Sequence, residues 1–545
     1  MRDEVSLRED SCNVARFLPL MAVSQPEACA LKTPDRRGGK LSYRSTSYSD
    51  LDKAVDRKCR RFHSRGIRRG MRVLLLVRPG YDLIVVVFAL FKIGAVPVVI
   101  DPGMGIRNFL RCVRSSRPEG LVAIAAGRVL SRLFFRAFRT VRYRLPAQDK
   151  NDGGTDAVFE TAQTDPNDPA AILFTSGSTG AAKGVCYEHG MFAAQVEAIR
   201  EQYGISPGEV DLPMLPIFAL FNPALGMTTV VPEMNPSRPA EVDPSRIVEA
   251  IQMCGVTNSF GSPVLWDKVG RYCRDHRARL PSLRRILMAG APVPPSLMAA
   301  FRDLVPNAEI HTPYGATESL PVSSISAVEV LGDTKERTER GEGTCVGQIF
   351  PEMEVRILPI EDGEIEKMDD VEALAVGEVG EIVVRGPVVT LSYDGLEEET
   401  RRAKILSDKG IWHRMGDAGY FDDQGRLWFC GRVVERVETK EGTLYTACCE
   451  GIFNRVSGVF RTALIGLDRD GVKVPALVVE PEPERFPRSS RDKEDFIRLL
   501  RVHGGGYGCT RSIETFFFCR KFPVDVRHNA KIHRLALARR FNRDR

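Results

Sequence analysis

The segment between Thr175 and Gly184 holds residue types that suit a phosphate chain. Glycine lets the backbone adopt turns that a ligand can approach closely, and Ser and Thr hydroxyls donate hydrogen bonds. Successive backbone N–H groups can form an anion-binding nest, and a lysine adds a positive charge. The sequence therefore predicts a phosphate-binding loop, and a Ser/Gly hairpin turn without a ligand is the alternative. The residues expected to contribute are Thr175, Ser176, Gly177, Ser178, Thr179, Gly180 and Lys183.

The position of the lysine separates this loop from the P-loop of nucleotide triphosphatases. The P-loop motif reads Gly-x4-Gly-Lys-Ser/Thr and opens a helix. Here Lys183 follows Gly180 by three residues, and Gly184–Tyr187 has the composition of a strand. Because the apolar segment Ala170–Phe174 before the loop also predicts a strand, we expect the loop to join two strands.

Three further segments offer groups that suit a nucleotide and a divalent cation. Residues 314–318 read Tyr-Gly-Ala-Thr-Glu, residues 412–417 read Trp-His-Arg-Met-Gly-Asp, and residues 523–531 end in a lysine. A hard cation prefers carboxylate oxygens, and a carboxylate is the usual partner of the vicinal hydroxyls of a ribose. Considered alone, the first segment could be a turn before a helix, and Lys531 could be one more cation in a basic tail.

Together with the glycine-rich loop, these segments resemble in chain order the motifs of the adenylate-forming superfamily. That superfamily contains acyl-CoA synthetases, nonribosomal-peptide adenylation domains and luciferases, and the resemblance covers nearly the whole chain. It implies that the enzyme uses ATP and Mg²⁺, that Thr317 contacts the α-phosphate and that Glu318 binds Mg²⁺. It also implies that Lys531 bridges the substrate carboxylate and the α-phosphate, where a lysine stabilises the charge that grows on phosphorus.

The same resemblance implies which residues surround the adenine and the ribose. The ring of Tyr314 would pack at the adenine, and Asp417 would accept hydrogen bonds from the ribose hydroxyls. Arg432, at the start of the family's hinge motif, would also reach the nucleotide. The remaining members of the implied nucleotide site are Gly290, Ala291, Pro292 and Gly315.

Several longer stretches resemble one branch of the superfamily, the olefin-pathway β-lactone synthetases. They are Met214–Pro223, Val230–Ala240, Val437–Thr439 and Phe522–Lys531. This resemblance implies that a long-chain β-hydroxy acid and ATP give an acyl-adenylate, and that the substrate's own hydroxyl then displaces AMP to form a β-lactone. Closing a strained four-membered ring requires close positioning and exclusion of water. The resemblance also implies olefin-pathway enzymes as partners.

The residues after the hinge arginine bear on the second half-reaction. CoA ligases commonly carry Asp or Lys where this chain has Val434, and Glu438–Gly442 differs from the loop that contacts the thiol in those enzymes. Both departures favour a reaction without a second external nucleophile. Transfer of the acyl group to CoA or a carrier thiol is the alternative, and a catalytically silent nucleotide- or acyl-binding relative is a third. The base that takes the hydroxyl proton is left open among His189, His311 and Glu318.

Composition places the chain among ordinary globular proteins. Of its 545 residues 43% are hydrophobic and 27% are charged, and a net charge of +6 does not argue for nucleic acid. Thirteen cysteines without a Cys-x-x-Cys pair favour a reducing, cytoplasmic setting, and the N-terminus lacks the apolar stretch of a secretory signal. The apolar run Leu83–Ile100 contains Lys92, Gly94 and Pro97, so a buried helix over Tyr81–Ile93 followed by a strand explains it better than a membrane span.

Alternating helix and strand patterns predict the α/β class. The expected architecture is a large N-terminal adenylation domain, residues 1–430, made of stacked, mostly parallel αβ subdomains. A small β-rich subdomain is expected near Gly343–Arg385. The remaining residues, 431–545, are expected to form a small, mobile α+β lid domain that carries Lys531.

Two apolar segments suggest contacts with lipid-like molecules. Val129–Val141 predicts an amphipathic helix with a basic stripe, which is either a solvated face over a packed core or a peripheral contact with anionic lipid or an acidic partner. Ile217–Leu225 is either core or part of a tunnel for an acyl chain. The arginines of the stripe are Arg128, Arg132, Arg136 and Arg139.

Overall fold

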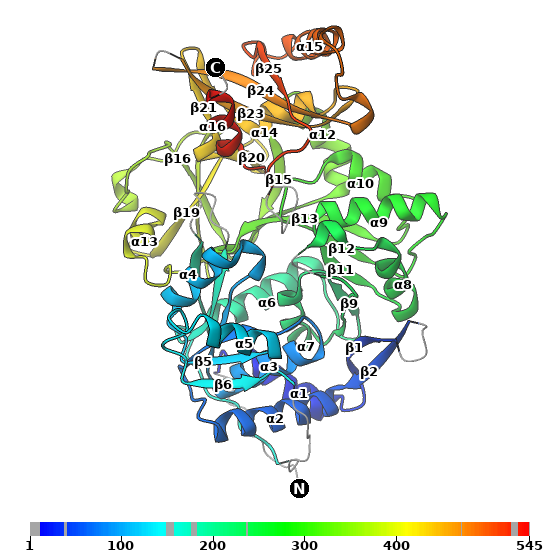
Figure 1. Ribbon diagram of the computed structural model, residues 1–545, viewed down its shortest axis with the longest axis vertical. Coiled ribbons are helices and arrows are strands. Elements are labelled where there is room, and N and C mark those ends of the chain that lie inside the picture. Colours follow the sequence, from blue (N-terminus) through cyan, green and yellow to red (C-terminus); the bar gives the residue numbers. More distant parts are fainter. Residues whose placement is uncertain are drawn as a thin grey trace.

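Two β-sheets and the helices packed against them form most of the molecule (Figure 1). The computed structural model describes residues 11–36, 41–148, 157–175, 182–235, 238–469, 471–524 and 532–543. Separate apolar cores lie between the two sheets and on the outer face of each, so the layers run helix, sheet, helix, sheet, helix. The α/β class expected from the sequence is confirmed.

The smaller sheet has six strands in the order β6-β5-β3-β4-β7-β8. All neighbours run parallel except β7 and β8, which are antiparallel and flank the glycine-rich segment. Parallel neighbours require crossover connections, which is why helices cover both faces of this sheet. The strands are β3 Arg72–Leu76, β4 Val96–Val99, β5 Gly120–Ala123, β6 Tyr143–Pro146, β7 Pro169–Thr175 and β8 Lys183–Glu188.

The larger sheet begins with a mostly parallel half. Its order is β2-β1-β10-β9-β11-β12-β13, and only the edge strand β2 runs antiparallel to its neighbour. The carboxyl ends of its parallel strands therefore meet at one edge, where α/β proteins usually bind their ligands. The strands are β1 Cys29–Asp35, β2 Ser42–Ser47, β9 Val210–Pro213, β10 Thr228–Val230, β11 Asn258–Gly261, β12 Arg285–Met288 and β13 Glu309–Ala316.

From β13 onwards the larger sheet is antiparallel, in the order β13-β14-β15-β20-β19-β17-β16, with β18 paired to β19. This half contains the β-rich region expected near Gly343–Arg385. The region continues the sheet of the parallel half through β14 and β15 and does not stand apart from it. The strands are β14 Ser319–Ser326, β15 Thr344–Ile349, β16 Glu354–Leu358, β17 Gly380–Arg385, β18 Lys404–Ser407, β19 Gly410–Phe421 and β20 Leu427–Arg432.

The helices divide by the sheet face that they cover. Helices α2, α3 and α6 supply the core between the sheets, α4 and α5 cover the outer face of the smaller sheet, and α8, α9 and α10 cover the larger one (Figure 1). The helices of this part are α1 Phe17–Ser24, α2 Tyr48–Ser64, α3 Tyr81–Ile93, α4 Ile106–Ser116, α5 Ala125–Leu133, α6 His189–Tyr203, α7 Asn222–Leu225, α8 Pro244–Cys254, α9 Pro263–Asp275, α10 Pro295–Phe301, α11 Ala327–Glu329, α12 Lys335–Glu339 and α13 Glu397–Ala403.

Helix α3 explains the lysine in the longest apolar run. Lys92 is fully buried, and its Nζ lies 3.0 Å from Asp52 Oδ1 and 2.5 Å from Asp56 Oδ1, both on α2. Two carboxylates offset the desolvation of the ammonium group, so a charge is tolerated inside the core. The predicted helix over Tyr81–Ile93 is confirmed. Among the described residues no helix combines the length and apolar character of a membrane span.

The helix expected over Val129–Val141 is wrong in its bounds. Helix α5 ends at Leu133, and consecutive turns follow as far as Thr140. In these turns the N–H of Ala137 bonds to the carbonyl of Phe134, and the N–H of Val141 bonds to that of Phe138. Turns that repeat every three residues place apolar side chains on one side much as a helix does, so the spacing alone did not distinguish the two.

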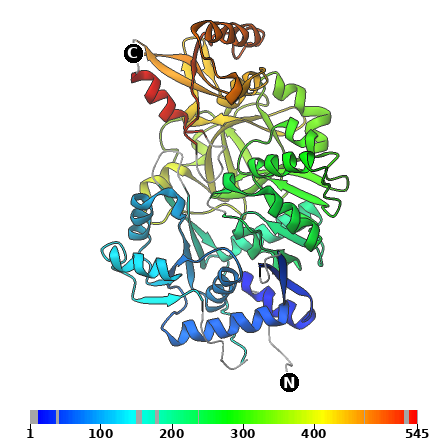
Figure 2. The same ribbon diagram turned by 45° about the vertical axis from the view of Figure 1, so that its right-hand side comes forward.

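The C-terminal part is a small α+β unit beyond the antiparallel half of the larger sheet (Figures 1 and 2). It contains the sheet β23-β24-β25 and the separate hairpin β21-β22. The charged stretch at 481–495 contains the start of α15, where Ser489 and Asp492 form a capping box. The elements are β21 Val437–Thr439, β22 Gly442–Leu444, α14 Thr446–Phe453, β23 Val459–Arg469, β24 Val472–Pro481, α15 Ser490–Gly505, β25 Thr515–Phe518 and α16 Arg534–Arg543.

Candidate functional site

The glycine-rich segment connects β7 to β8. Thr175 is the last residue of β7, Lys183 is the first of β8, and the two are partners in the antiparallel register. The two flanking strands that distinguish this segment from a P-loop are therefore confirmed. The residues predicted between them, Ser176, Gly177, Ser178, Thr179 and Gly180, lie outside the described residues.

Lys183 contacts an acidic and an aromatic side chain. Its Nζ lies 2.5 Å from Glu399 Oε2 on α13 and 4.8 Å from the centre of the Tyr393 ring. The Lys183 side chain is only 18% exposed, whereas that of Glu399 is 41% exposed. A partly exposed ion pair contributes little free energy, so this lysine can exchange its carboxylate partner for another anion.

Thr317 and Glu318 form the turn between β13 and β14. Tyr187 of β8 donates a hydrogen bond to the main-chain oxygen of Thr317, at 2.5 Å. Tyr393 donates to Glu318 Oε1, at 2.9 Å. The alternative of a turn followed by a helix is wrong, because the chain returns as the antiparallel strand β14.

Two glycines shape the backbone at the carboxyl ends of β12 and β13. A Cβ atom on Gly315 would lie 2.6 Å from the main-chain oxygen of Ser319, so a side chain does not fit there. Gly290, just beyond β12, has φ of 97°, a conformation that glycine adopts without strain. Because β12 and β13 are parallel neighbours, Gly290, Ala291 and Pro292 follow at the same edge of the sheet as the predicted 314–318 motif.

Tyr393 joins two parts of the predicted site. Its ring faces Lys183, its hydroxyl bonds to Glu318, and its backbone forms a bridge to Val185 of β8. No motif or charge spacing in the sequence marks Tyr393 as a site residue. Its role as a link becomes visible only when the antiparallel half of the sheet is placed against β8.

A buried lysine lies behind Glu318. Lys404, the first residue of β18, donates hydrogen bonds to the main-chain oxygen of Thr390 and to its hydroxyl, the latter at 3.3 Å. Thr390 in turn donates to the main-chain oxygen of Glu318 from its N–H, at 2.9 Å, and from its hydroxyl, at 3.1 Å. Burial lowers the pKa of Lys404 to about 7, and the nearby charge of Glu318 opposes this shift. No motif in the sequence marks this lysine either.

Asp417 on β19 lies between side chains of two other strands. Tyr314 of β13 donates to Oδ2, at 2.7 Å, and Arg432 of β20 donates to Oδ1, at 2.6 Å. Burial, followed by the charge of Asp417, raises the pKa of Tyr314 well above its usual value, so the phenol keeps its proton. The charge of Asp417 is the largest effect that raises the pKa of Arg432. The structure thus brings together three residues that the sequence predicted to surround a nucleotide.

Three side chains were left open as the base that takes the hydroxyl proton. The structure places one of them, Glu318, beside other residues of the predicted site. His189 is buried at the start of α6 against the ring of Phe91, and burial lowers its pKa to about 4. His311 bonds to Glu309 and packs against the ring of Tyr203. Among the described residues, Glu318 alone of the three contacts Tyr393.

An apolar cavity adjoins the turn of Thr317 and Glu318. Pro313 and Leu320 border it from the two strands on either side of that turn. The segment expected to be core or acyl tunnel contributes Phe218, Phe221 and Leu225, and the Phe218 ring lies 4.1 Å from that of Phe260. The other lining residues are Ile199, Tyr203, Ile205, Asp211, Asn222, Met227, Asn258, Leu287 and Pro321.

One carboxylate lies in the wall of this apolar cavity. Asp211 is buried, and its two oxygens accept hydrogen bonds from Asn222, at 3.0 Å, and Asn258, at 2.6 Å. Burial raises the pKa of Asp211 to about 6, although both amides oppose the shift. The cavity is therefore apolar along most of its wall and polar where these three side chains meet.

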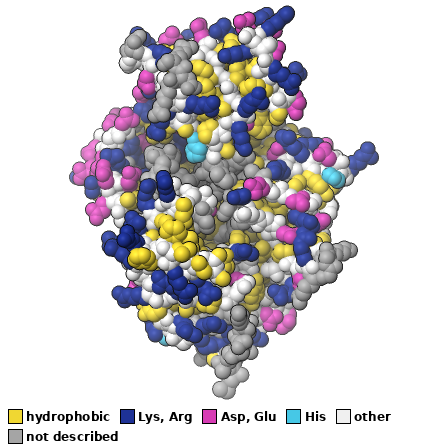
Figure 3. All heavy atoms as spheres, in the orientation of Figure 1, with side chains coloured by type: hydrophobic (Ala, Val, Ile, Leu, Met, Phe, Trp, Pro, Cys, Tyr) yellow, Lys and Arg dark blue, Asp and Glu magenta, His cyan; other side chains and the backbone are white. Residues whose placement is uncertain are grey.

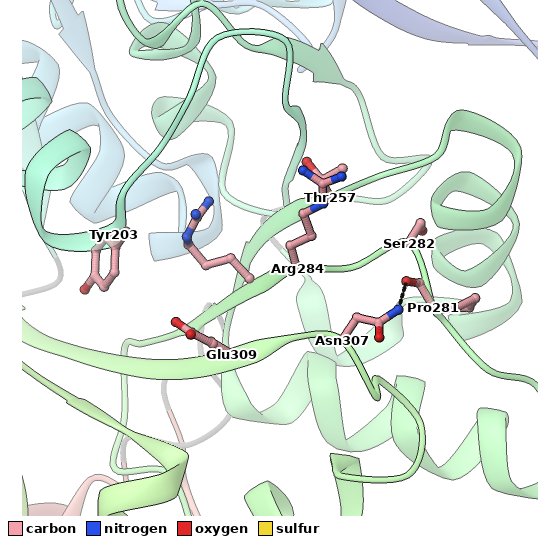
Figure 4. Close-up of a pocket in the computed structure, with 8 residues that line it drawn as sticks. Tyr203, Thr257, Pro281, Ser282, Arg284, Asn307 and Glu309 are labelled. Carbon is pink, nitrogen blue, oxygen red and sulfur yellow. Dashed lines mark hydrogen bonds between the residues drawn. The ribbon is translucent and has the colours of Figure 1, made fainter.

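A second pocket opens at the opposite edge of the larger sheet (Figure 4). Polar residues near the amino ends of β12 and β13 line it, among them Arg284, Glu309 and Asn307, which donates to the carbonyl of Pro281 at 2.9 Å. The predicted nucleotide residues lie at the carboxyl ends of these strands. The pocket of Figure 4 therefore does not belong to their cluster.

Lys531 lies outside the described residues, but the helix that follows it is anchored. Arg534, the first residue of α16, lies 2.9 Å from Glu435 and 2.6 Å from Glu450. Glu435 is three residues beyond Arg432. The end of the chain is thus tied to the segment that follows the predicted hinge arginine.

The described residues contain no group of three or more His, Cys, Asp or Glu side chains placed to hold a metal ion. Mg²⁺ commonly takes one or two protein carboxylates and fills the rest of its shell with phosphate and water. Glu318 offers such a carboxylate.

Comparisons with known proteins agree with this arrangement. The family model of the AMP-binding enzymes matches residues 24–394. Olefin β-lactone synthetases from Stenotrophomonas maltophilia (strain K279a) and Xanthomonas campestris pv. campestris are each 44% identical to this chain over 547 residues, which covers 97% of this chain and 97% of each relative. The structure of ATP-bound MatB from Rhodopseudomonas palustris has a TM-score of 0.79 at 19% identity, over 98% of this chain and 99% of MatB, and shows a shared fold.

Proposed function

The chain belongs to the family of AMP-binding enzymes, and on that premise we propose that it activates a long-chain β-hydroxy carboxylic acid with ATP and closes it to a β-lactone. The observation that carries the proposal is the 44% identity to two olefin β-lactone synthetases over 97% of the chain. The overall reaction would convert the acid and ATP to the lactone, AMP and pyrophosphate. Enzymes of an olefin pathway would supply the acid and consume the lactone.

In the first half-reaction a carboxylate oxygen of the acid attacks the α-phosphorus, and pyrophosphate leaves. We assign the phosphate chain to the loop Thr175–Lys183 and the α-phosphate to Thr317. Lys531 would contact both the carboxylate and the α-phosphate, where a positive charge stabilises the transition state. Lys183 would leave Glu399 when a phosphate arrives, which their partly exposed ion pair allows.

The nucleoside would lie along the carboxyl edge of the larger sheet. We assign the adenine to Tyr314 and Gly290–Pro292, and the ribose hydroxyls to Asp417, with Arg432 beside it. The two glycines at this edge support the assignment through the backbone that they shape. Gly290 adopts a φ of 97°, and Gly315 lets the main-chain oxygen of Ser319 pack closely against β13 beside Tyr314. Mg²⁺ at Glu318 would neutralise charge on the phosphate oxygens.

In the second half-reaction the substrate's hydroxyl oxygen attacks the acyl carbon and the bond to AMP breaks. The hydroxyl proton passes to a base, and the new C–O bond closes the four-membered ring. The apolar cavity beside Thr317 and Glu318 has a free volume of about 50 Å³, so the aromatic side chains in its wall would have to move apart to admit an alkyl chain. Its apolar wall would then exclude water from the mixed anhydride. We further propose that 431–545 acts as a lid on 1–430 and that it brings Lys531 to the site.

The decisive experiment supplies a long-chain β-hydroxy acid, ATP and Mg²⁺ without CoA. We expect a β-lactone, AMP and pyrophosphate in equal amounts. The matched acid without the hydroxyl should support exchange of pyrophosphate into ATP but give no lactone. A product that forms only when CoA is added, and that is a thioester, would overturn the lactone step in favour of acyl-CoA synthesis. Absence of exchange with every long-chain acid would overturn both.

Lys531 provides the test of the first half-reaction. The Lys531→Ala variant should lose pyrophosphate exchange while its circular dichroism and unfolding midpoint stay unchanged, because the removed charge acts only on the reacting groups. Normal exchange in this variant would refute the assigned role.

A further inference from the structure

The stretch from 102 to 148 is one of two strongly basic parts of the chain, and the other is 57–78. It contains ten arginines, no lysine and one acidic residue, Glu119, so its formal charge is +9 in a chain whose total is +6. The remainder of the chain therefore carries a net charge of −3. An asymmetry of this kind marks a surface for an anionic partner. The arginines are Arg107, Arg111, Arg114, Arg117, Arg128, Arg132, Arg136, Arg139, Arg142 and Arg144.

The fold gathers most of these arginines on one face. Helices α4 and α5 both cover the outer face of the smaller sheet, and they share one apolar core through Phe109 and Val113 of α4 and Leu130 of α5. The turns after α5 add Phe138 to the same core. The opposite sides of both helices point to solvent. Figure 3 shows yellow apolar side chains with dark blue basic ones beside them over this region.

The solvent side also exposes large apolar side chains. Leu133 is 71% exposed, Phe135 64%, Val129 52% and Ile106 48%. A single exposed apolar residue is ordinary on a protein surface, but several on α4, α5 and the turns after α5 mark a contact surface. We call the surface formed by these four side chains and the surrounding arginines the α4–α5 face.

The arginines of the α4–α5 face are available to an external anion. Among the described residues, Arg107, Arg111, Arg114, Arg132 and Arg139 make no ion pair or side-chain hydrogen bond. By contrast, Arg246 of α8 pairs with Glu249 of the same helix, and Arg402 of α13 pairs with Glu398. Within the stretch 102–148 the one acidic residue is Glu119, which is half-buried.

We propose that the α4–α5 face docks on an anionic lipid surface, with Leu133 and Phe135 among the acyl chains and the arginines against lipid phosphates. Exposed apolar side chains next to unpaired basic ones are the features of an interfacial segment, whose affinity combines apolar burial with attraction to anionic lipid. An acidic protein would pair with the arginines but would not require the exposed apolar side chains of Leu133 and Phe135. Nucleic acid is disfavoured because no base-reading motif accompanies the arginines.

The test measures co-sedimentation of the full-length protein with vesicles. Vesicles of phosphatidylcholine mixed with phosphatidylglycerol should bind the protein, and vesicles of phosphatidylcholine alone should not. Binding should fall when salt is raised, because salt screens exposed charges. Equal binding to both kinds of vesicle, binding that resists salt, or no binding to either would overturn the proposal, and the last outcome would leave an acidic protein as the partner.

Two variants separate the contribution of the arginines to vesicle binding from that of the exposed apolar side chains. Reversal of Arg107, Arg111, Arg132 and Arg139 to Glu should weaken binding to anionic vesicles at least about tenfold. The double variant Leu133→Ser and Phe135→Ser should weaken it while every charge stays in place. Unfolding midpoints equal to the parent's would show that both variants fold.

The matched control reverses four exposed basic residues at and before α15. They are Arg488, Arg491, Lys493 and Arg498. This control changes the net charge by the same amount as the first variant and should leave vesicle binding unchanged. If it weakened binding as much as the α4–α5 reversal did, total charge and not this face would be responsible, and the proposal would fail.

Discussion

The phenol of Tyr314 donates a hydrogen bond of 2.7 Å to the carboxylate of Asp417, although 103 residues separate them in the chain. The contact reaches from β13 to β19 across the antiparallel half of the larger sheet. Arg432 takes the other carboxylate oxygen, so both oxygens of Asp417 are engaged. A ribose bound here would meet a carboxylate whose position two strongly held donors already fix.

Replacing Tyr314 with Phe should weaken ATP binding without unfolding the protein. Phe keeps the ring that packs in the core but removes the donor to Asp417, so the carboxylate is less well positioned. Loss of one hydrogen bond to a charged group is worth about 1.5 kcal/mol at the low end, which corresponds to roughly a tenfold rise in KM for ATP. Steady-state kinetics with ATP as the varied substrate measure this effect.

The matched control is Asp417→Asn. It leaves the guanidinium of Arg432 without its counter-charge, so we expect a loss in kcat/KM larger than about a hundredfold. A KM for ATP in Tyr314→Phe that equals the parent value, or an effect of Asp417→Asn smaller than that of Tyr314→Phe, would contradict the assigned arrangement.

Replacing Glu399 with Gln should lower the KM for ATP. Glu399 pairs with Lys183 at 2.5 Å and therefore competes with a phosphate for that lysine. Exposed pairs contribute up to about 1 kcal/mol, so KM should fall at most about fivefold. Glu398→Gln is the control, because Glu398 lies on the same helix but pairs with Arg402. A KM that rises in Glu399→Gln, or that falls equally in the control, would show that Glu399 does not compete for Lys183.

The sequence predicts a helix end or a strand well where residues close together in the chain determine it. The ends of α3 and α8 follow from Gly94, with φ of 77°, and from Asp243, which caps the helix that Pro244 begins. The strands on both sides of the glycine-rich loop follow from composition in the same way. The bounds of α5 do not, because turns and a helix give similar apolar spacing over so short a stretch.

Contacts between distant segments could not be derived in this way. Tyr393 bonds to Glu318 across 75 residues, and Lys404 reaches the same turn only through Thr390. Both depend on how the antiparallel half of the larger sheet closes against β8. No residue near Tyr393 or Lys404 carries a spacing that indicates this closure, so the resemblance supplied the motifs and the structure supplied the residues that hold them.

His189 should make the protein less stable in acid. Its pKa falls from 6.5 to about 4 on folding because it is buried, so the unfolded chain binds the proton more strongly between these values. The contribution of neutral His189 to the free energy of unfolding is therefore fully present above pH 6.5. It is lost as pH falls toward 4, by at most about 1.4 kcal/mol per pH unit. Urea unfolding at pH 7 and pH 5 should therefore show a smaller difference in His189→Gln than in the parent.

The control for this measurement is His276→Gln at an exposed position. His276 follows α9 and bonds only to a nearby carbonyl, that of Tyr272. Its variant should keep the parent's loss of stability between pH 7 and pH 5. If His189→Gln kept the same loss as well, another group would be responsible for the acid sensitivity.

Lys404→Met should lower turnover without lowering stability at neutral pH. Burial lowers the pKa of Lys404 to about 7 from 10.5, so the unfolded chain binds this proton more strongly between those values and stability rises with pH across that range. Methionine removes this dependence, which is at most about 1.4 kcal/mol per pH unit. Turnover should fall several-fold, because Thr390 loses the donor that fixes it behind Glu318. Urea unfolding at pH 7 and pH 9, together with kcat against pH, measures both effects.

Lys404 could act only as a structural residue, or its protonation could affect Glu318. Only the second role would change the pH profile of turnover. If the protonation of Lys404 acts through Thr390 on Glu318, any inflection of kcat near pH 7 should disappear in Lys404→Met and return in part in Lys404→Arg, which restores a cation. Lys409→Met, at the exposed end of the same hairpin, should keep the parent's profile and stability. A Lys404→Met variant with the parent's kcat at every pH would show that this buried lysine only fills space, because Met matches its length but carries no charge and donates no hydrogen bond.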